Sequence, residues 1–182
     1  MSSKKSLTAR FLPALAIASC ALAGAPIVSM AQGTPGLTIF SGVERQYQLG
    51  YRLDYDGVPG RTDRYHLRIP ADKMKLAAAQ FAITYPSSYE GTFDADQIEV
   101  RVNGDSVPLD EVNWDRDNRV VEIYPRTPVP ADNRVELVFS NVRNPARVGT
   151  HYFNALIRSP GDVPLLRYIG TWIVSIGSEN NN

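Results

Sequence analysis

Hydrophobic and polar residues alternate along much of the chain, with the two-residue period of a β-strand. From Tyr47 to Tyr55 the odd positions are Tyr or Leu, and the even positions are Gln, Gly, Arg and Asp. Residues 64–69 and 97–102 alternate in the same way. A strand with one buried face produces this pattern, whereas an amphipathic helix repeats every 3.6 residues. The alternation therefore predicts a domain built of β-strands.

Three further strands are predicted in the C-terminal part of the chain, at 134–140, 150–158 and 165–176. The loop between the first two contains Asn144-Pro145, and Ser159-Pro160-Gly161 ends the second strand. Pro and Gly interrupt strands because they do not fit a continuous ladder. The Asn144-Pro145 loop is either a recognition surface or a structural corner of the chain.

The remaining sequence predicts shorter elements in the order of the chain: strands at 37–40, 79–85, 107–114 and 119–124, and one helical turn at 70–75. Asn103-Gly104 is a strong hairpin signal, because a type I′ turn needs two residues that tolerate positive φ. We expect 107–114 to return along the same sheet as 97–102, and 47–55 to pair with 64–69.

Eight to ten short strands with frequent turn signals predict an all-β fold. We expect an immunoglobulin-like antiparallel β-sandwich, with an antiparallel β-barrel as the alternative. The predicted organisation is a signal peptide at 1–31, a short lead at 32–36, a single sandwich domain at 37–177 and a polar tail at 178–182. The residues expected in the core include six aromatic ones: Tyr47, Tyr51, Tyr55, Tyr65, Trp114 and Trp172.

The first 31 residues have the pattern of a secretory signal. Three basic residues precede an apolar run at 11–28, and Ser29-Met30-Ala31 places small residues where a signal peptidase cleaves. The predicted processing site lies between Ala31 and Gln32. The alternatives are a membrane anchor and a lipoprotein acylated at Cys20, which follows the lipobox-like Ile17-Ala18-Ser19. Cleavage after Ala31 leaves no cysteine and no membrane span, so the mature domain would be held by its core without disulfides.

Charge narrows the choice of partners. The 19 basic and 19 acidic residues balance, and loss of residues 1–31 leaves 16 basic against 19 acidic residues, a net charge of −3. Nucleic-acid binding depends on a clustered excess of Lys and Arg. The sequence contains no such run, so we expect no nucleic-acid partner.

The sequence shows no recognisable catalytic motif. His66 and His151 are the candidate neutral-pH bases, and neither accompanies a Gly-x-Ser-x-Gly motif. Acidic pairs at 54–57 and 115–118 have the two-residue spacing of calcium ligands but fail the EF-hand pattern. Arg143 could clamp a carboxylate or brace its loop. We therefore predict no catalytic, cofactor-binding or metal-binding residues and no cofactor.

Several short motifs together resemble a family of secreted cyanobacterial proteins of unknown function, DUF2808. They are Trp114-Asp115-Arg116-Asp117-Asn118-Arg119, Pro128-Val129-Pro130, Val142-Arg143-Asn144-Pro145, Gly149 with Tyr152-Phe153, Ser159-Pro160-Gly161 and Tyr168-Ile169-Gly170. The resemblance covers about Tyr65 to Ile176, and the Asn-Pro with its downstream Gly-x-x-Tyr-Phe is its most specific part. It implies an exported bacterial domain with a sandwich-like fold, and it assigns no activity.

Two functions follow as expectations. The preferred one is a non-enzymatic cell-envelope domain that binds a protein or glycan partner in the periplasm, outside the cell or in the thylakoid lumen. The alternative is a hydrolase of envelope polysaccharide, or a calcium-dependent enzyme, with carboxylates that only the fold brings together.

Overall fold

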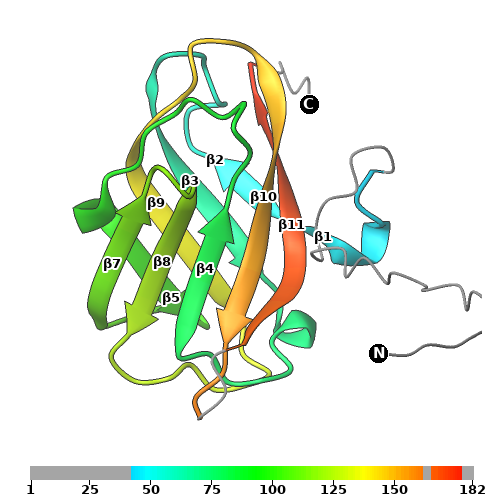
Figure 1. The fold of residues 1–182 in the computed structure, drawn as a ribbon, viewed down its shortest axis with the longest axis vertical. Helices are drawn as coiled ribbons and strands as arrows, with labels where there is room; N and C mark the ends of the chain where they lie inside the picture. Colours follow the sequence, from blue (N-terminus) through cyan, green and yellow to red (C-terminus); the bar gives the residue numbers. More distant parts are fainter. Residues whose placement is uncertain (1–41, 162–164, 178–182) are drawn as a thin grey trace, which may run out of the picture. The chain divides into compact units, whose positions relative to one another are not determined.

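The computed structural model describes residues 42–161 and 165–177 (Figure 1). These residues form three 3₁₀ turns, η1 Arg45–Tyr47, η2 Ala71–Lys73 and η3 Ala95–Gln97. They also form eleven strands: β1 Gln48–Leu49, β2 Tyr51–Leu53, β3 Thr62–Ile69, β4 Gln80–Thr84, β5 Ile98–Val102, β6 Asp105–Val107, β7 Leu109–Asp115, β8 Val120–Pro125, β9 Val135–Arg143, β10 Gly149–Arg158 and β11 Leu166–Ile176. The predicted signal segment with Cys20, Ala31 and Gln32, the strand at 37–40 and the tail at 178–182 lie outside the described residues.

The strands form two sheets that pack face to face (Figure 1). Sheet A has the order β1-β11-β10-β4-β8-β7, and sheet B has the order β2-β3-β9-β5-β6. All strand pairs are antiparallel except β1 with β11. Each sheet keeps two edge strands, so the barrel alternative is wrong. The immunoglobulin-like antiparallel sandwich is confirmed.

The core lies between the two sheets and is rich in aromatic side chains. Phe153 and Trp172 from sheet A and Tyr65 and Phe139 from sheet B are completely buried. The indole Nε1 of Trp172 donates a hydrogen bond to the backbone oxygen of Arg68, 3.0 Å away in sheet B. This contact satisfies the polar atom of a buried tryptophan. It also ties the two sheets together without a disulfide.

The predicted strand at 47–55 is divided at Gly50. Its first part is β1 in sheet A and its second part is β2 in sheet B, so the chain passes from one sheet to the other there. Tyr47 and Tyr55 lie beyond the two short strands and are 42% and 62% exposed, so their assignment to the core was wrong. Tyr51 packs partly buried against the core. Alternation identified the inward side of the strands correctly but not where they end.

A second change of sheet corrects the prediction for 107–114. The Asn103-Gly104 hairpin is confirmed, with positive φ at both residues, and it pairs β5 with β6. The chain then leaves sheet B at Pro108, and β7 runs along the edge of sheet A. Proline has no N–H to donate to a ladder, which makes it a suitable boundary. Trp114, near the end of β7, is therefore only half-buried.

Candidate functional site

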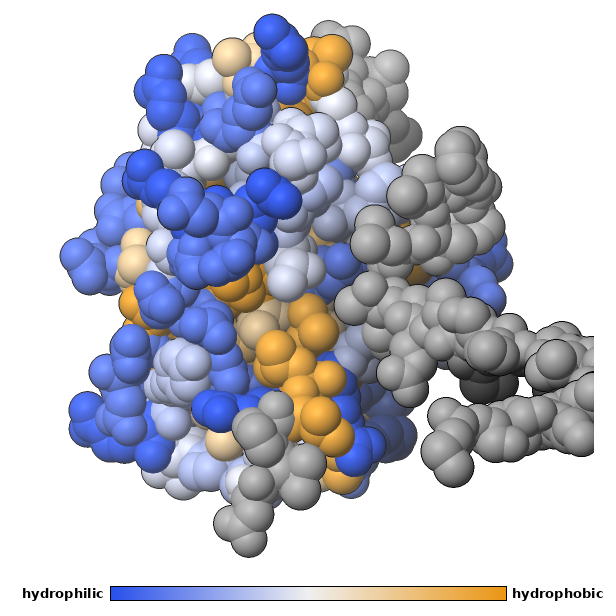
Figure 2. All heavy atoms as spheres, viewed as in Figure 1, coloured by the Kyte–Doolittle hydropathy of each residue, from blue (hydrophilic) through white to orange (hydrophobic). Residues whose placement is uncertain are grey.

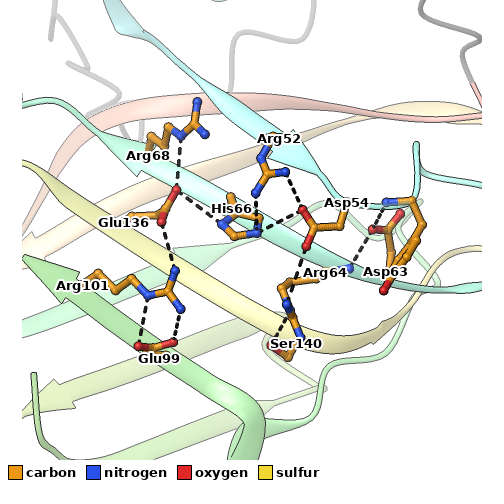
Figure 3. A network of polar contacts seen from close by, with 11 residues as sticks. Arg52, Asp54, Asp63, Arg64, His66, Arg68, Glu99, Arg101, Glu136 and Ser140 are labelled. Atoms are coloured by element: carbon orange, nitrogen blue, oxygen red, sulfur yellow. Dashed lines mark hydrogen bonds and ion pairs between the residues drawn. The ribbon is translucent and has the colours of Figure 1, made fainter. Parts of the chain in front are cut away.

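The outer face of sheet B carries most of the charged contacts of the domain (Figure 3). Alternate residues of its strands point away from the core, because successive side chains of a strand face opposite ways. These outward residues are Arg52 of β2, Arg64, His66 and Arg68 of β3, Glu136 and Ser140 of β9, and Glu99 and Arg101 of β5. Asp54, just after β2, joins them. Four neighbouring strands thus place a network of acids and bases on one surface.

His66 lies at the centre of this network, between two carboxylates. Its Nε2 is 3.2 Å from Oδ1 of Asp54 and 3.0 Å from Nη2 of Arg52, and its Nδ1 is 3.4 Å from Oε1 of Glu136. His66 is 6% exposed. Its polar contacts within the described chain come from these three residues, and none of them is a serine or threonine nucleophile. The arrangement therefore lacks the nucleophile that a histidine base would activate in acyl transfer.

Arginines neutralise the carboxylates of this face. Arg101 forms a two-pronged contact with Glu99, with Nε and Nη2 at 3.1 and 2.7 Å from the carboxylate oxygens. The hydrogen bonds from Arg101 lower the pKa of Glu99. Arg68 Nε is 3.2 Å from Glu136 Oε1, and Arg52 Nη1 is 2.8 Å from Asp54 Oδ1. Each of these three carboxylates is thus paired with at least one arginine.

A shallow pocket of about 420 Å³ opens at one end of this face. Its lining includes Arg68, Arg101 and Arg134 but a single acid, Glu136, which gives the lining a formal charge of +2. A glycosidase needs two carboxylates on either side of the bond that it cleaves. One carboxylate held by arginines does not meet that requirement, whereas an excess of guanidinium groups suits an anionic ligand.

Arg134 differs from the other pocket arginines in its contacts. It is exposed, and it makes no ion pair with any residue in the described parts of the chain. Its backbone is nevertheless fixed by Asn103: Arg134 N donates to Asn103 Oδ1 at 3.1 Å, and Asn103 N donates to Arg134 O at 2.9 Å. The pocket therefore has a free guanidinium on a positioned backbone.

Two glycines, Gly50 and Gly104, line the pocket. A Cβ atom added at Gly50 or Gly104 would meet nothing within 4 Å. Gly104 has φ +105°, which the hairpin turn requires. Gly50 has no such constraint and contributes its backbone oxygen, which accepts a hydrogen bond from Arg68 N at 2.9 Å. A side chain added at Gly50, in the lining of the pocket, would therefore meet no atom of the domain at its Cβ.

The second histidine has a structural environment. His151 is 5% exposed, and its ring packs edge-on against Tyr89 with centroids 5.2 Å apart. Burial lowers its pKa, and its Nε2 has no hydrogen-bond partner among the described residues. The hydroxyl of Ser88 lies 3.5 Å from Nδ1. This long contact does not form a nucleophile–base pair.

The acidic pairs suggested for calcium have other partners. Both carboxylate oxygens of Asp115 accept hydrogen bonds from Asn118, one from its backbone N and one from its side chain. These bonds lower the pKa of Asp115 and stabilise the turn between β7 and β8. Asp54 belongs to the arginine network described above. Within residues 42–161 and 165–177 no group of three or more possible ligands is arranged to hold a metal ion.

The Asn144-Pro145 loop is a structural corner. The side chain of Asn144 is 3% exposed, and its Nδ2 donates to Val58 O at 2.9 Å and to Asp63 Oδ2 at 3.3 Å. Its Oδ1 accepts a hydrogen bond from the hydroxyl of Tyr65 at 2.5 Å. Pro145 O accepts from Gly60 N. The loop thus fastens the β2–β3 connection to the end of β9, with its most identifying side chain out of reach of a partner.

Arg143 braces the same region through its backbone. Its N and O exchange hydrogen bonds with Thr92 at 2.9 and 3.0 Å. Arg143 is exposed, and its guanidinium forms no ion pair within the described chain. Of the two predicted roles, the geometry supports bracing of the loop, through the backbone.

Figure 2 shows the molecule from the side of sheet A, where a group of hydrophobic residues lies exposed among hydrophilic ones. The exposed large hydrophobic residues of the described chain include Tyr152 of β10, Leu165 just before β11 and Leu166 of β11.

The three-residue turns are the only helices in the described chain, and none of them could cross a membrane.

Sequence reasoning missed the pocket arginines. Arg68 and Arg101 were assigned to the polar sides of their strands, and Arg134 to the start of a strand. Alternation shows that such residues face solvent, but it does not show that β3, β9 and β5 are neighbours. The one available signal was the Asn-Gly turn, which places Asn103 at a strand end where it can hold Arg134.

Solved structures with a similar arrangement of strands share little sequence with the chain. A crystal structure of the bacterial hydrophobin BslA has a TM-score of 0.44 and 17% identity, over 71% of this chain and 94% of that one. The collagen-binding domain of a Staphylococcus aureus adhesin has a TM-score of 0.41 and 10% identity, over 75% and 99%. A C-terminal fragment of the major pilin GBS80 of Streptococcus agalactiae has a TM-score of 0.44 and 10% identity; the match covers 71% of this chain and 54% of the fragment.

Family membership rests on sequence. Among curated proteins, none matches the chain. The model of the family described as "Protein of unknown function (DUF2808)" matches residues 37–176. This match includes every strand of both sheets and the residues of the arginine pocket. The chain belongs to the DUF2808 family.

Proposed function

We propose that this protein is an exported, non-enzymatic domain of the cell envelope that binds an acidic protein or glycan partner through the outer face of sheet B. The signal-like segment at 1–31 supports export. The observation that carries the binding role is the pocket lined by Arg68, Arg101 and Arg134, with Glu136 as its single acid.

The charge of this face favours an acidic partner. Its cations are Arg52, Arg64, Arg68, Arg101 and Arg134, and its acids are Asp54, Glu99 and Glu136. Five positive and three negative groups leave a formal charge of +2, on a chain whose expected mature form has a net charge of −3. Such local separation of charge steers an oppositely charged partner to one surface.

A binding experiment tests this function. The full-length chain is immobilised, and envelope protein and polysaccharide are passed over it at low and high salt. We expect retention by the wild type and its loss in the double variant Arg68→Ala, Arg134→Ala. The matched control, Arg126→Ala with Arg147→Ala, removes two exposed arginines elsewhere and should retain the partner. Retention should also fall at high salt, because the Debye length shrinks to about 3 Å at 1 M.

The same material tests the enzymatic alternative. Retained polysaccharide is incubated with the protein, and new reducing ends are measured. A rate of cleavage that the wild type shows and the Glu136→Gln variant lacks would contradict a purely binding role. Equal retention by the wild type and the Arg68, Arg134 double variant would contradict the choice of surface.

A further inference from the structure

We propose that the arginine-lined pocket at the end of sheet B binds a carboxylate-bearing sugar residue of an envelope polysaccharide. This inference rests on the proposed function, because it names the ligand chemistry of the same surface. It is carried by the contacts of Arg134, the shape of the pocket and the backbone that surrounds it.

The three arginines of the pocket differ in how far the domain already uses their guanidinium groups. Arg68 is paired with Glu136, and Arg101 is paired chiefly with Glu99. Nη1 of Arg101 lies 3.7 Å from Glu136 Oε2, which is too far for a hydrogen bond. Arg134 makes no ion pair in the described chain. A carboxylate entering the pocket would therefore meet guanidinium N–H groups that the domain does not use. Guanidinium groups bind carboxylates through parallel hydrogen bonds.

The pocket has the size and the mixed lining of a small-molecule site. The pocket volume of about 420 Å³ falls within the range of about 300–1,000 Å³ typical of small-molecule sites. Pro70 and the methylene stems of the arginines supply apolar surface, while Asn103 adds a polar group. A sugar ring has the same mixture, with apolar C–H faces and hydroxyl edges, so an acidic monosaccharide unit matches both the charge and the lining.

The backbone around the pocket does not offer the free strand edge to which an extended peptide would pair. The pocket crosses the ends of β3, β9 and β5, and the backbone groups there are already paired. Val135 lies between Ile69 and Val102 in the sheet, and Gly50 O accepts from Arg68 N. A peptide that adds to a sheet needs a free strand edge. The pocket offers side chains in place of such an edge, and side-chain hydrogen bonds to hydroxyl and carboxylate groups are what a saccharide can use.

Gly50 provides the sharpest test. A Gly50→Trp variant adds a large aromatic side chain to the lining of the pocket and leaves every charge in place. The position accepts a Cβ, which would meet nothing within 4 Å. Arg134→Ala removes the free guanidinium and leaves the pocket open. Arg126→Ala is the matched control, since Arg126 is 65% exposed and pairs with Asp110, away from the pocket. Circular dichroism and thermal unfolding establish that each full-length variant is folded.

The probes are trigalacturonate, its neutral methyl ester and triglutamate, measured by titration calorimetry. We expect trigalacturonate to bind the wild type, with affinity lowered at least about tenfold in Gly50→Trp and in Arg134→Ala and within about twofold in Arg126→Ala. The ester should bind at least about tenfold more weakly than the acid, since it lacks the carboxylates. Triglutamate should also bind more weakly, since it lacks the ring.

Three results would overturn the inference: no binding of trigalacturonate, equal binding by Gly50→Trp and wild type, or triglutamate binding as well as trigalacturonate. The proposed function is judged separately by retention of envelope material. If retention depends on Arg68 and Arg134 while trigalacturonate does not bind, the saccharide inference fails and the binding function stands. If retention is independent of these arginines, the proposed function fails as well.

Discussion

Replacement of Asn144 by alanine should destabilise the fold, because this side chain joins three segments. The variant removes three hydrogen bonds: two donated by Nδ2, to Val58 O and Asp63 Oδ2, and one accepted by Oδ1 from Tyr65. The backbone bond from Asn144 N to Arg61 O remains. Tyr65 keeps its contact with the hydroxyl of Tyr89 at 3.1 Å. The loss is therefore confined to the Asn144 amide.

The expected cost follows from these bonds. Each buried hydrogen bond contributes about 0.5–1.5 kcal/mol, and a bond to a charged group such as Asp63 contributes about 1.5–3 kcal/mol. The 3.3 Å length of that bond places it at the lower end. The sum is about 2.5–4.5 kcal/mol, a large part of a typical stability of about 5–15 kcal/mol. In a domain of this size it corresponds to a fall in Tm of about 5–18 °C.

Urea unfolding followed by tryptophan fluorescence, together with a thermal scan, measures this change. Asn113→Ala is the control, because Asn113 is exposed and makes one 3.4 Å contact with Glu122. Its effect should stay below about 0.5 kcal/mol. A loss of less than about 1 kcal/mol in Asn144→Ala would refute the structural role of the loop. Loss of partner binding at unchanged stability would show that Asn144 belongs to a recognition surface.

Three further predictions concern titration and packing. Burial lowers the pKa of His151, so between about pH 7 and pH 5 the unfolded chain gains a proton that the folded chain does not. The free energy of unfolding should therefore fall as the pH is lowered over this range. His151→Phe should remove this part of the pH dependence, measured as urea midpoints at the two pH values, and an unchanged dependence would contradict the prediction. Burial raises the pKa of Tyr65 and of Tyr89, so the free energy of unfolding should fall as the pH rises above about 10. Ultraviolet absorbance should show that these two tyrosines ionise together with unfolding. Their ionisation in the folded protein at about pH 10 would disprove the prediction. Gly170→Ala would place Cβ 2.7 Å from Leu49 Cγ and 2.8 Å from Tyr47 O. We therefore expect β1 to be displaced from β11, at a cost of about 1–3 kcal/mol in the free energy of unfolding. A variant as stable in urea as the wild type would show that the contact relaxes freely.

Much of the fold could be predicted because its signals are local. Alternation located β3, β5 and the three C-terminal strands, and Asn103-Gly104 identified a hairpin with positive φ at both residues. Two breaks were missed, at Gly50 and Pro108, where the chain changes sheets. A glycine or proline within an alternating run shows that the ladder is interrupted. It does not show which sheet the next strand joins, because that depends on partners far along the chain.

The candidate site was predictable to a smaller extent. His66 was identified as a possible base, but the carboxylates of Asp54 and Glu136 on its two sides come from β3's neighbours in the sheet. The Asn144-Pro145 loop was identified as the most specific motif of the family, with either a recognition or a structural role. The burial of Asn144 gives it the structural role. The distribution of Lys and Arg along the sequence indicated no basic cluster. Arg68, Arg101 and Arg134 are spaced 33 positions apart in the sequence and come together only in the fold.

The amino-acid sequence by itself determined the β-strand character, the inward side of most strands and the family, because these depend on side-chain period and short motifs. Tertiary structure alone decided the strand order, the buried position of Asn144 and the gathering of Arg68, Arg101 and Arg134 around one pocket. The physical reason is that alternation specifies which way a side chain points, whereas a site requires knowledge of which strands are neighbours. Neighbouring strands are selected by packing of the whole core.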